Sequence, residues 1–342
     1  MFLRNVWYVA GFSSELQAGH HLARKFLNES VVLFRTSDGM LGALQDRCSH
    51  RGMPLSCGQV SGGIIRCAYH GFEFDTRGAC TKAPGAENVP RRAELRSYPV
   101  LERDQVIWVW MGDPKRADVS LIPGHAVHED PDWVWRTEYF HLQASWELLI
   151  DNLLDLTHLA YVHGKTIGGN PEVHFATKTN SVREGDRVKV ARHMPDSLPP
   201  ATYVSAAGFK GRVDRWQEVE FEPVLVRVSA GACDVGTGAL EGRRKGGFGM
   251  IMLHGITPET EKTTHYLWSI ATNVKDRGIP EAVFDDIDVT IAEDKHVLEA
   301  QQLCLDEHPG GAFVDVPGDV GANQVRRLIR SLAEAESRTA AI

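Results

Sequence analysis

The chain has 342 residues, of which 43% are hydrophobic and 24% charged. This length predicts two domains, each able to bury its own core, and the composition excludes a disordered chain, a collagen and a disulfide-stapled miniprotein. The 45 acidic and 37 basic side chains give a formal net charge of −8, which argues against binding of nucleic-acid phosphates. No apolar run approaches the roughly 20 residues of a membrane span. The apolar stretch in the first residues is too short for the hydrophobic region of a signal peptide, so we expect a cytoplasmic protein with no nucleic-acid or membrane partner.

Residues 1–115 are predicted to form short strands joined by turns. Segments 31–44 and 64–80 each place apolar runs around a polar turn, which is typical of a β-hairpin. A further aromatic-rich strand, 106–114, ends in Gly-Asp-Pro. These elements indicate a small β domain.

Residues 116–342 have longer elements and are predicted to form a second domain. Segment 144–163 has a dense apolar pattern without glycine or proline, and is predicted to be one helix. Strands are predicted over 178–193, 215–231, 247–257 and 262–274, and further helices over 280–306 and 323–336. A sheet covered by helices makes this domain α+β.

Two short segments each combine one cysteine with one histidine. They read Cys48-Ser-His50-Arg-Gly and Cys67-Ala-Tyr-His70-Gly, and both are expected at β-turns. Two thiolates and two imidazoles can hold a tetrahedral zinc ion. They can also hold a Rieske [2Fe–2S] cluster, in which the cysteines bind one iron and the histidines bind the other.

The spacing favours the cluster over zinc. Zinc-finger ligands usually pair like with like, whereas each segment here supplies one ligand of each kind and can reach both irons. Gly52 and Gly71 follow the histidines, so the backbone can approach closely and amide N–H groups can bond to the bridging sulfurs. Packing roles are predicted for the remaining cysteines, Cys57, Cys80, Cys233 and Cys304.

A second group of candidate metal ligands lies in the predicted helix 144–163. Asp155 and His158 share a face of this helix, whereas His163 lies about 140° round from His158. Both histidines can bind one metal only if the helix loosens or ends there, for instance in a π-like turn.

Two histidines need one carboxylate to complete the facial triad of a mononuclear iron(II) oxygenase. Asp294 is the best candidate, because it is an acid in an otherwise apolar stretch of the predicted helix 280–306. Its neighbour Glu293 is the rival, and points about 100° away on an ideal helix.

These motifs resemble those of the Rieske non-haem iron oxygenases. The chain is similar to their oxygenase component, and most similar to the vanillate O-demethylase and dicamba monooxygenase group. The resemblance implies an N-terminal all-β Rieske domain over 1–115, followed by a helix-grip catalytic domain of antiparallel sheet plus helices over 116–342, and a homotrimer. The matching segments are Arg4-Asn5-x-Trp7-Tyr8-Val9-Ala10, Cys48-x-His50-Arg51, Cys67-x-Tyr69-His70-Gly71, Trp108-x-Trp110-x-Gly112-Asp113-Pro114, Asp151-Asn152-Leu153-x-Asp155-Leu156-x-His158, Tyr161-Val162-His163 and Thr257-Pro258-Glu259-Thr260.

The same resemblance implies roles for individual residues. Asp155 would bridge His158 to a Rieske histidine of the neighbouring subunit, expected to be His70, and so provide a path for electrons. Asn152 would face the iron at longer range, and His254 would hydrogen-bond a substrate carboxylate. The implied cluster ligands are Cys48, His50, Cys67 and His70, and the implied Fe(II) ligands are His158, His163 and Asp294.

The function implied is that of a terminal oxygenase that receives electrons from a separate NADH-dependent ferredoxin or flavin reductase and splits O2. The leading hypothesis is oxidative O-demethylation of a methoxybenzoate such as vanillate, and the alternative is hydroxylation of another aromatic carboxylate. A Rieske electron carrier without oxygenase activity is a hypothesis from a different class, but a carrier needs only residues 1–115. The resemblance is weaker over segments 195–215 and 231–248, which should shape the pocket, so the sequence supports the chemistry better than the substrate.

Overall fold

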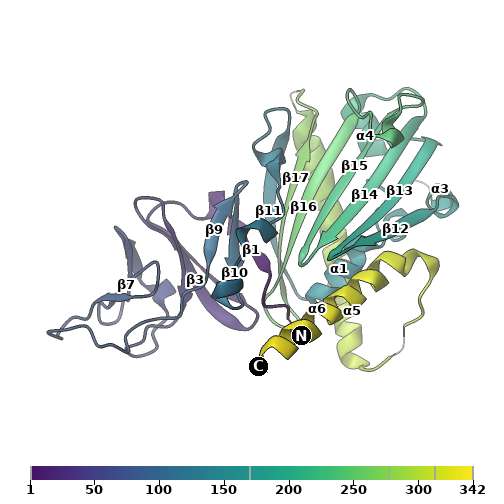
Figure 1. Ribbon diagram of the computed structural model, residues 1–342. Helices are drawn as coiled ribbons and strands as arrows, with labels where there is room; N and C mark the ends of the chain where they lie inside the picture. The colour runs from purple at the N-terminus through teal and green to yellow at the C-terminus, as the bar shows by residue number, and fades with distance from the viewer. Residues whose placement is uncertain (1, 169–170, 277, 312, 341–342) are drawn as a thin grey trace. The chain divides into compact units, whose positions relative to one another are not determined.

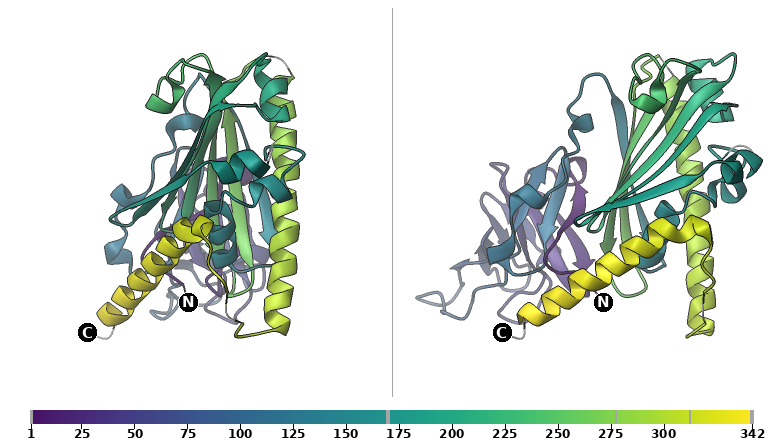
Figure 2. Two further views of the ribbon diagram at one scale, coloured as in Figure 1. Left: turned by 90° about the vertical axis from the view of Figure 1, so that its right-hand side faces the viewer. Right: turned by 45° about the vertical axis from the view of Figure 1, so that its right-hand side comes forward.

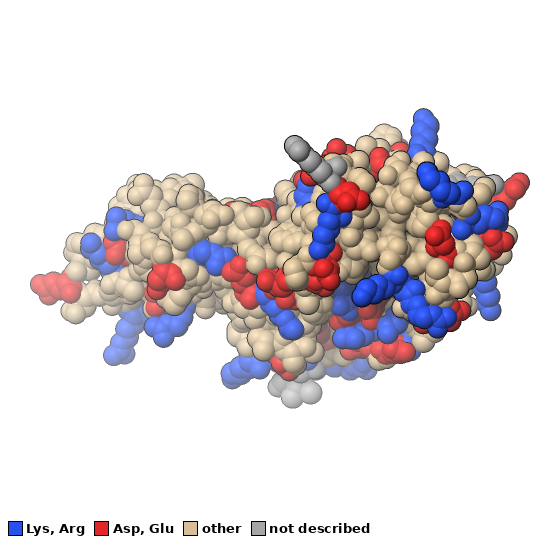
Figure 3. Space-filling view, turned by 90° about the horizontal axis from the view of Figure 1, so that it is seen from above, with Lys and Arg blue, Asp and Glu red and all other residues tan. Residues whose placement is uncertain are grey.

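The computed structural model describes residues 2–168, 171–276, 278–311 and 313–340 (Figure 1). The chain divides into two compact units, Met1–Gly124 with Thr257–Glu261, and His125–Ile256 with Lys262–Ile342. Within the described ranges, no helix is long and apolar enough to cross a membrane. Acidic and basic side chains are interspersed over the face shown in Figure 3.

The first unit contains three small antiparallel sheets in its described part. They consist of β1 (Trp7–Phe12), β10 (Val106–Trp110) and β9 (Val100–Arg103); of β2 (His21–Phe26), β3 (Glu29–Arg35) and β4 (Leu41–Gln45); and of β5 (Gln59–Ser61), β6 (Ile64–Arg66), β7 (Glu73–Asp75) and β8 (Cys80–Lys82). The hairpin predicted over 31–44 is confirmed as β3 and β4, and the polar turn predicted within 64–80 joins β7 to β8. One-turn 3-10 helices lie at Ser13–Glu15, Leu55–Cys57, Pro114–Arg116 and Val119–Leu121.

The second unit is built on a seven-stranded antiparallel sheet in the order β11-β17-β16-β15-β14-β13-β12. The strands are β11 (Val134–Leu142), β12 (Thr179–Glu184), β13 (Arg187–Ser197), β14 (Val213–Glu222), β15 (Leu225–Asp234), β16 (Phe248–Pro258) and β17 (Thr264–Thr272). Predicted segments 178–193 and 215–231 are each a hairpin, which turn at Gly185 and Val224 with φ of 61° and 62°. The α+β class predicted for this part of the chain is confirmed.

Helices accompany this sheet, and three of those described pack directly against it (Figures 1 and 2). The helices are α1 (Trp146–Leu154), α2 (Leu159–Val162), α3 (Pro171–Ala176), α4 (Ala201–Ala207), α5 (Ile279–Glu307) and α6 (Val320–Ala340), with further 3-10 turns at Ala126–His128, Ala239–Glu241 and Pro317–Asp319. α5 contacts β11 and β17, α6 contacts β12 and β13, and α1 contacts β14.

The long helix α5 buries one stripe of its surface. Ile287, Ile291, Asp294 and Leu298 follow one another at intervals of three or four residues and are all buried. Asp294 therefore stands on the apolar stripe that faces inward, where an acid is costly unless it has partners.

The prediction of one continuous helix over 144–163 is wrong. α1 begins after Ser145, whose hydroxyl accepts a hydrogen bond from a backbone amide of its first turn, but it ends at Leu154. Asp155 is extended, with φ −90° and ψ 109°, and its Oδ1 accepts from both the backbone N–H and the hydroxyl of Thr157 at 2.6 Å. Such short polar side chains bond the backbone locally and so compete with the helix. The chain resumes as the single turn α2, with His158 at its N-cap and His163 at its C-cap.

Candidate metal centres

The two cysteine–histidine segments form matching loops in the first unit. In each loop the cysteine N–H, of Cys48 or of Cys67, donates to the carbonyl five residues later at 2.8 Å. The glycine N–H donates back to the cysteine carbonyl, at 2.9 Å for Gly52 and 3.1 Å for Gly71. Both glycines have left-handed φ values, 75° and 72°, which other residues adopt only at a cost. The backbone of each loop thus curls around its cysteine in the same way.

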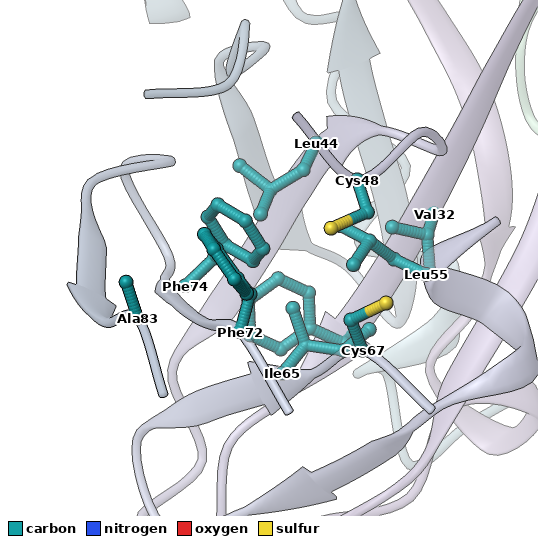
Figure 4. Close-up of a cluster of buried hydrophobic side chains, with 10 residues drawn as sticks. Val32, Leu44, Cys48, Leu55, Ile65, Cys67, Phe72, Phe74 and Ala83 are labelled. Atoms are coloured by element: carbon teal, nitrogen blue, oxygen red, sulfur yellow. The ribbon is translucent and has the colours of Figure 1, made fainter. Parts of the chain in front are cut away.

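The thiols and the imidazoles of these loops lie in different surroundings. Cys48 and Cys67 are 2% exposed, at the edge of the apolar cluster drawn in Figure 4, whereas His50 and His70 are exposed with their ring centroids 4.5 Å apart. Burial raises the pKa of the Cys48 thiol, the backbone amide of His50 bonds its sulfur and acts against this, and the neighbouring Cys67 thiol raises it further. Two adjacent thiols inside and two adjacent imidazoles outside fit a [2Fe–2S] cluster with one iron on each side.

His158, His163 and Asp294 meet in the second unit. One ligand atom from each lies within 4.8 Å of the other two. Asp294 Oδ1 is 3.5 Å from His158 Nε2 and 3.1 Å from His163 Nε2. Both Nε2 atoms are buried and neither makes a hydrogen bond within the described structure. Two imidazole nitrogens without hydrogen bonds and one carboxylate oxygen thus lie close together, as the three ligands in the facial triad of a mononuclear iron do.

The other polar atoms of these three residues are held by neighbours. His158 Nδ1 lies 2.6 Å from the backbone carbonyl of Asp155, and His163 Nδ1 lies 2.8 Å from Glu293 Oε2. Asn152 donates from Nδ2 to Asp294 Oδ1 at 3.0 Å. Such partners fix the orientation and the tautomer of ligating groups. The rival acid Glu293 therefore contacts Nδ1 of His163, whereas Asp294 lies beside the Nε2 atoms of both histidines.

Asp155 contacts His158 mainly through its main chain. Its carboxylate Oδ2 is 3.8 Å from His158 Nδ1, farther than the 2.6 Å of its carbonyl oxygen. The carboxylate is 24% exposed, and Oδ1 is engaged by Thr157. Arg192, which is buried, donates to the next carbonyl, Leu156, at 2.7 Å and so holds the helix break in place.

The two histidines differ in their electrostatic surroundings. Burial lowers the pKa of His158, although Asp294 acts against it, and the net pKa is lowered. Burial also lowers the pKa of His163, but the carboxylates of Asp294 and Glu293 outweigh it and the net pKa is raised.

A pocket adjoins this group of residues and spans about 670 Å³ of empty space. Its floor consists of alternate residues of three neighbouring strands, as expected for side chains on one face of a sheet. They are Arg215, Gln217 and Val219 of β14, Val228 and Ala230 of β15, and Met250, Met252 and His254 of β16. Helix residues, including the two histidines and Asp294, line the other side. A mostly apolar pocket with a few polar groups is typical of a small-molecule site.

His254 lies on this floor and is 1% exposed. Its Nδ1 is 2.6 Å from the hydroxyl of Tyr266. Burial lowers the pKa of His254 to about 3 and raises that of Tyr266, so the imidazole is neutral and the phenol keeps its proton. The phenol lies against this imidazole, so its proton points to Nδ1, and Nε2 then carries the N–H. That N–H has no acceptor within the described structure.

The sequence reasoning missed several residues of the pocket. Arg215 and Gln217 stand at alternate positions of a predicted strand, in line with Val219, and this period of two would have placed them on its inner face. Tyr266 gave no signal, because its contact with His254 depends on the sheet order. Two predicted packing cysteines, Cys57 and Cys304, are exposed, which contradicts that prediction.

Family models match both parts of the chain. The Rieske [2Fe–2S] domain matches residues 6–99, and the vanillate O-demethylase oxygenase C-terminal domain matches residues 142–335. The first match decides for the iron–sulfur cluster over zinc, and the second decides against a simple electron carrier.

Similar proteins match nearly the full length. The iron–sulfur subunit of the toluene-4-sulfonate monooxygenase system of Comamonas testosteroni is 38% identical, over 98% of this chain and 99% of that protein. A vanillate O-demethylase oxygenase subunit of a Pseudomonas species is 35% identical, over 99% and 97%. The crystal structure of dicamba monooxygenase bound to 3,6-dichlorosalicylic acid superposes with a TM-score of 0.91 and 30% identity, over 98% and 99%. The chain belongs to the Rieske non-haem iron oxygenases, as an oxygenase component of the vanillate O-demethylase and dicamba monooxygenase group with a [2Fe–2S] cluster and a mononuclear iron.

Proposed function

We propose that this chain is the oxygenase component of an NADH- and O2-dependent monooxygenase that removes the methyl group of a methoxybenzoate such as vanillate. The balanced reaction takes the methyl ether, O2, NADH and a proton to the phenol, formaldehyde, water and NAD+. Hydroxylation of the methyl carbon gives a hemiacetal, which collapses without further catalysis. The match of residues 142–335 to the vanillate O-demethylase C-terminal domain supports this reaction class.

The proposal rests on one observation: the residues of the metal group form part of the lining of the pocket. His158, His163 and Asp294 all line the pocket, so a methyl group placed there lies beside the metal. These three residues would hold a mononuclear iron with open coordination positions, which would supply the activation of O2. The apolar floor holds the ring, and His254 donates its Nε2–H to an oxygen of the substrate.

We assign the residue roles as follows. The cluster ligands are Cys48, His50, Cys67 and His70, and the iron ligands are His158, His163 and Asp294. Asn152 and Glu293 are positioning residues, because Asn152 donates to Asp294 Oδ1 and Glu293 bonds His163 Nδ1, on the side of that ring away from the metal. Residues 1–115 form the Rieske domain and 116–342 the catalytic domain.

The partners follow from the family. A reductase that oxidises NADH delivers electrons to the cluster, and three copies of the chain form a ring. In such a trimer Asp155 lies between His158 and the partner's His70, and passes electrons from one copy to the next. Its carboxylate is partly exposed, as a contact with a second copy requires.

A second reaction is favoured by one comparison, because this chain is 38% identical to the iron–sulfur subunit of the toluene-4-sulfonate monooxygenase system. Hydroxylation of an aryl methyl group inserts oxygen into the same kind of C–H bond and gives a stable alcohol. The two reactions differ in the atom that carries the methyl group, oxygen or ring carbon.

Both reactions can be tested with the purified chain and a surrogate reductase. We expect NADH oxidation that depends on a methoxybenzoate, with formaldehyde formed in step. Conversion of toluene-4-sulfonate to its alcohol, without demethylation of any methoxybenzoate, would select the second reaction. NADH oxidation that no aromatic acid stimulates would overturn both.

A further inference from the structure

We propose that Arg215 binds the anionic group of the aromatic substrate, a carboxylate or a sulfonate, at the end of the pocket far from His254. This inference rests on the proposed function, since it names the residue that selects an acid. It also departs from the resemblance, which implies that His254 binds the anion.

Arg215 is a buried cation that lines the pocket. It is 3% exposed, and Nη2 donates to the backbone carbonyl of Ile167 at 2.9 Å. Its guanidinium lies 5.1 Å from the centre of the Tyr203 ring. Its Nε has no hydrogen-bond partner within the described structure, so the side chain keeps unused donors.

No carboxylate of the described residues lies within ion-pair distance of Arg215, whereas several other arginines of the second unit have one. Arg227 of β15 pairs with Glu220 at 3.0 Å, and Arg244, which lies between β15 and β16, pairs with Glu218. A buried charge without a counter-charge is costly. An anionic ligand removes this cost and accepts from the unused donors, which is why a guanidinium is suited to carboxylates and sulfonates.

Among the described residues that line the pocket, Arg215 is the one permanent cation. His254, the other candidate for the anion, is neutral because its pKa is lowered to about 3. A neutral N–H donor serves a phenol or ether oxygen as well as an anion. The guanidinium is charged, and therefore binds the anionic group of the substrate in preference to a neutral oxygen.

The register of the sheet separates the two residues. Arg215 pairs with Ala232, whereas His254 pairs with Val226, which in turn pairs with Phe221 on the strand of Arg215. Arg215 and Phe221 are six residues apart, or roughly 20 Å along the strand at about 3.3 Å per residue. One carboxylate does not reach both residues.

The metal group lines the same pocket as Arg215. The guanidinium contacts the Ile167 carbonyl and the Tyr203 ring and none of the three residues His158, His163 and Asp294. A substrate with its anion on Arg215 therefore leaves another edge of its ring for the iron.

Binding to the holoprotein tests the inference directly. Calorimetry with 4-methoxybenzoate and toluene-4-sulfonate is compared with the neutral 4-methoxybenzamide, in wild type, Arg215→Gln and Arg215→Lys. We expect Arg215→Gln to weaken both acids roughly 100-fold, since a charge-assisted hydrogen bond is lost, and to change the amide by less than about threefold. Arg215→Lys should recover part of the affinity for the acids. Arg244→Gln, which removes a similarly stacked arginine outside this pocket, should change neither class.

The ratio of acid to amide affinity separates recognition from a structural role. Equal loss for acids and amide in Arg215→Gln would overturn the inference, as would a wild type that binds the acids no better than the amide. Turnover is measured separately: acids that bind through Arg215 but are not oxidised would refute the proposed function and leave this inference standing.

Discussion

Glu293 and His163 form a hydrogen-bonded pair, with Oε2 of the acid 2.8 Å from Nδ1 of the ring. Asp294, the next residue of α5, lies on the other side of the same ring, with Oδ1 3.1 Å from Nε2. Successive helix residues point about 100° apart, and this difference places one carboxylate behind the imidazole and the other in front of it. Two adjacent acids thus have separate tasks, one to orient the ring and one to bind the metal.

Replacement of these two acids should have different effects on iron content. Asp294→Ala should lose the mononuclear iron, because it removes one of the three ligands, and should keep the cluster. Glu293→Gln should keep the iron with an affinity weakened roughly 10–100-fold, as for other contacts behind a ligand. Iron and acid-labile sulfide are measured after dialysis against a weak chelator. Selective iron loss in Glu293→Gln, with iron retained in Asp294→Ala, would reverse the assignment.

The cluster should depend on Cys67. In Cys67→Ser we expect loss of the [2Fe–2S] absorption and of the rhombic EPR signal of the reduced protein, because serine is a poor ligand for this soft site. Cys304→Ser is the matched control, since Cys304 is exposed and lies in the other unit. An unchanged EPR signal in Cys67→Ser, or a wild-type protein that contains zinc and no sulfide, would contradict the assignment.

Asp155→Asn should keep both metal centres and stall electron transfer between them. The asparagine retains an Oδ1 that can accept from Thr157, so the break between α1 and α2 is preserved. The carboxylate charge that stabilises a protonated or ligating imidazole is lost. Reoxidation of the reduced cluster by O2 in the presence of substrate is followed by stopped-flow absorption. Reoxidation at the wild-type rate would remove the bridging role.

His254 should make the protein less stable as the pH falls. Its pKa is lowered to about 3 in the folded chain, against about 6.5 when unfolded. Between these values the unfolded chain binds a proton that the folded chain does not, so stability declines as pH drops below 6.5. At about pH 5.5 the loss is about 1.4 kcal/mol, or roughly 3 °C in unfolding midpoint for a unit of this size.

The variant His254→Gln removes this titrating group, so the fall in midpoint between about pH 7.5 and 5.5 should be smaller by that amount. Tyr266→Phe is the matched control, because it removes the hydrogen bond but leaves the imidazole buried, and should retain the fall. Identical pH dependence in wild type and His254→Gln would show that the imidazole is solvated in the folded chain. Thermal unfolding of protein stripped of mononuclear iron provides the measurement.

Ligands that lie close together along the chain could be predicted from the sequence. Cys48 with His50, and Cys67 with His70, are set by local turns, so their spacing carries the information. Asp294 required a second argument, an acid on an apolar helix stripe, and the structure brings it to the two histidines. The distinct task of Glu293 follows only from how α5 packs against α2.

The break in the predicted helix could not be foreseen from hydrophobic periodicity. The apolar pattern continues through Asp155, and the helix ends there because Asp155 bonds Thr157 and Arg192 holds the carbonyl of Leu156. Arg215 escaped notice for a related reason. Among the described residues no carboxylate pairs with Arg215; this is a property of the folded sheet, and no pattern of spacing along the chain predicts it.

The most direct test of the proposed reaction is a single turnover of the chemically reduced protein with O2 and 4-methoxybenzoate, without a reductase. The account predicts 4-hydroxybenzoate and formaldehyde in equal amounts, and neither product from Asp294→Ala. Full reoxidation of the cluster with no oxygenated product from 4-methoxybenzoate or toluene-4-sulfonate would contradict it.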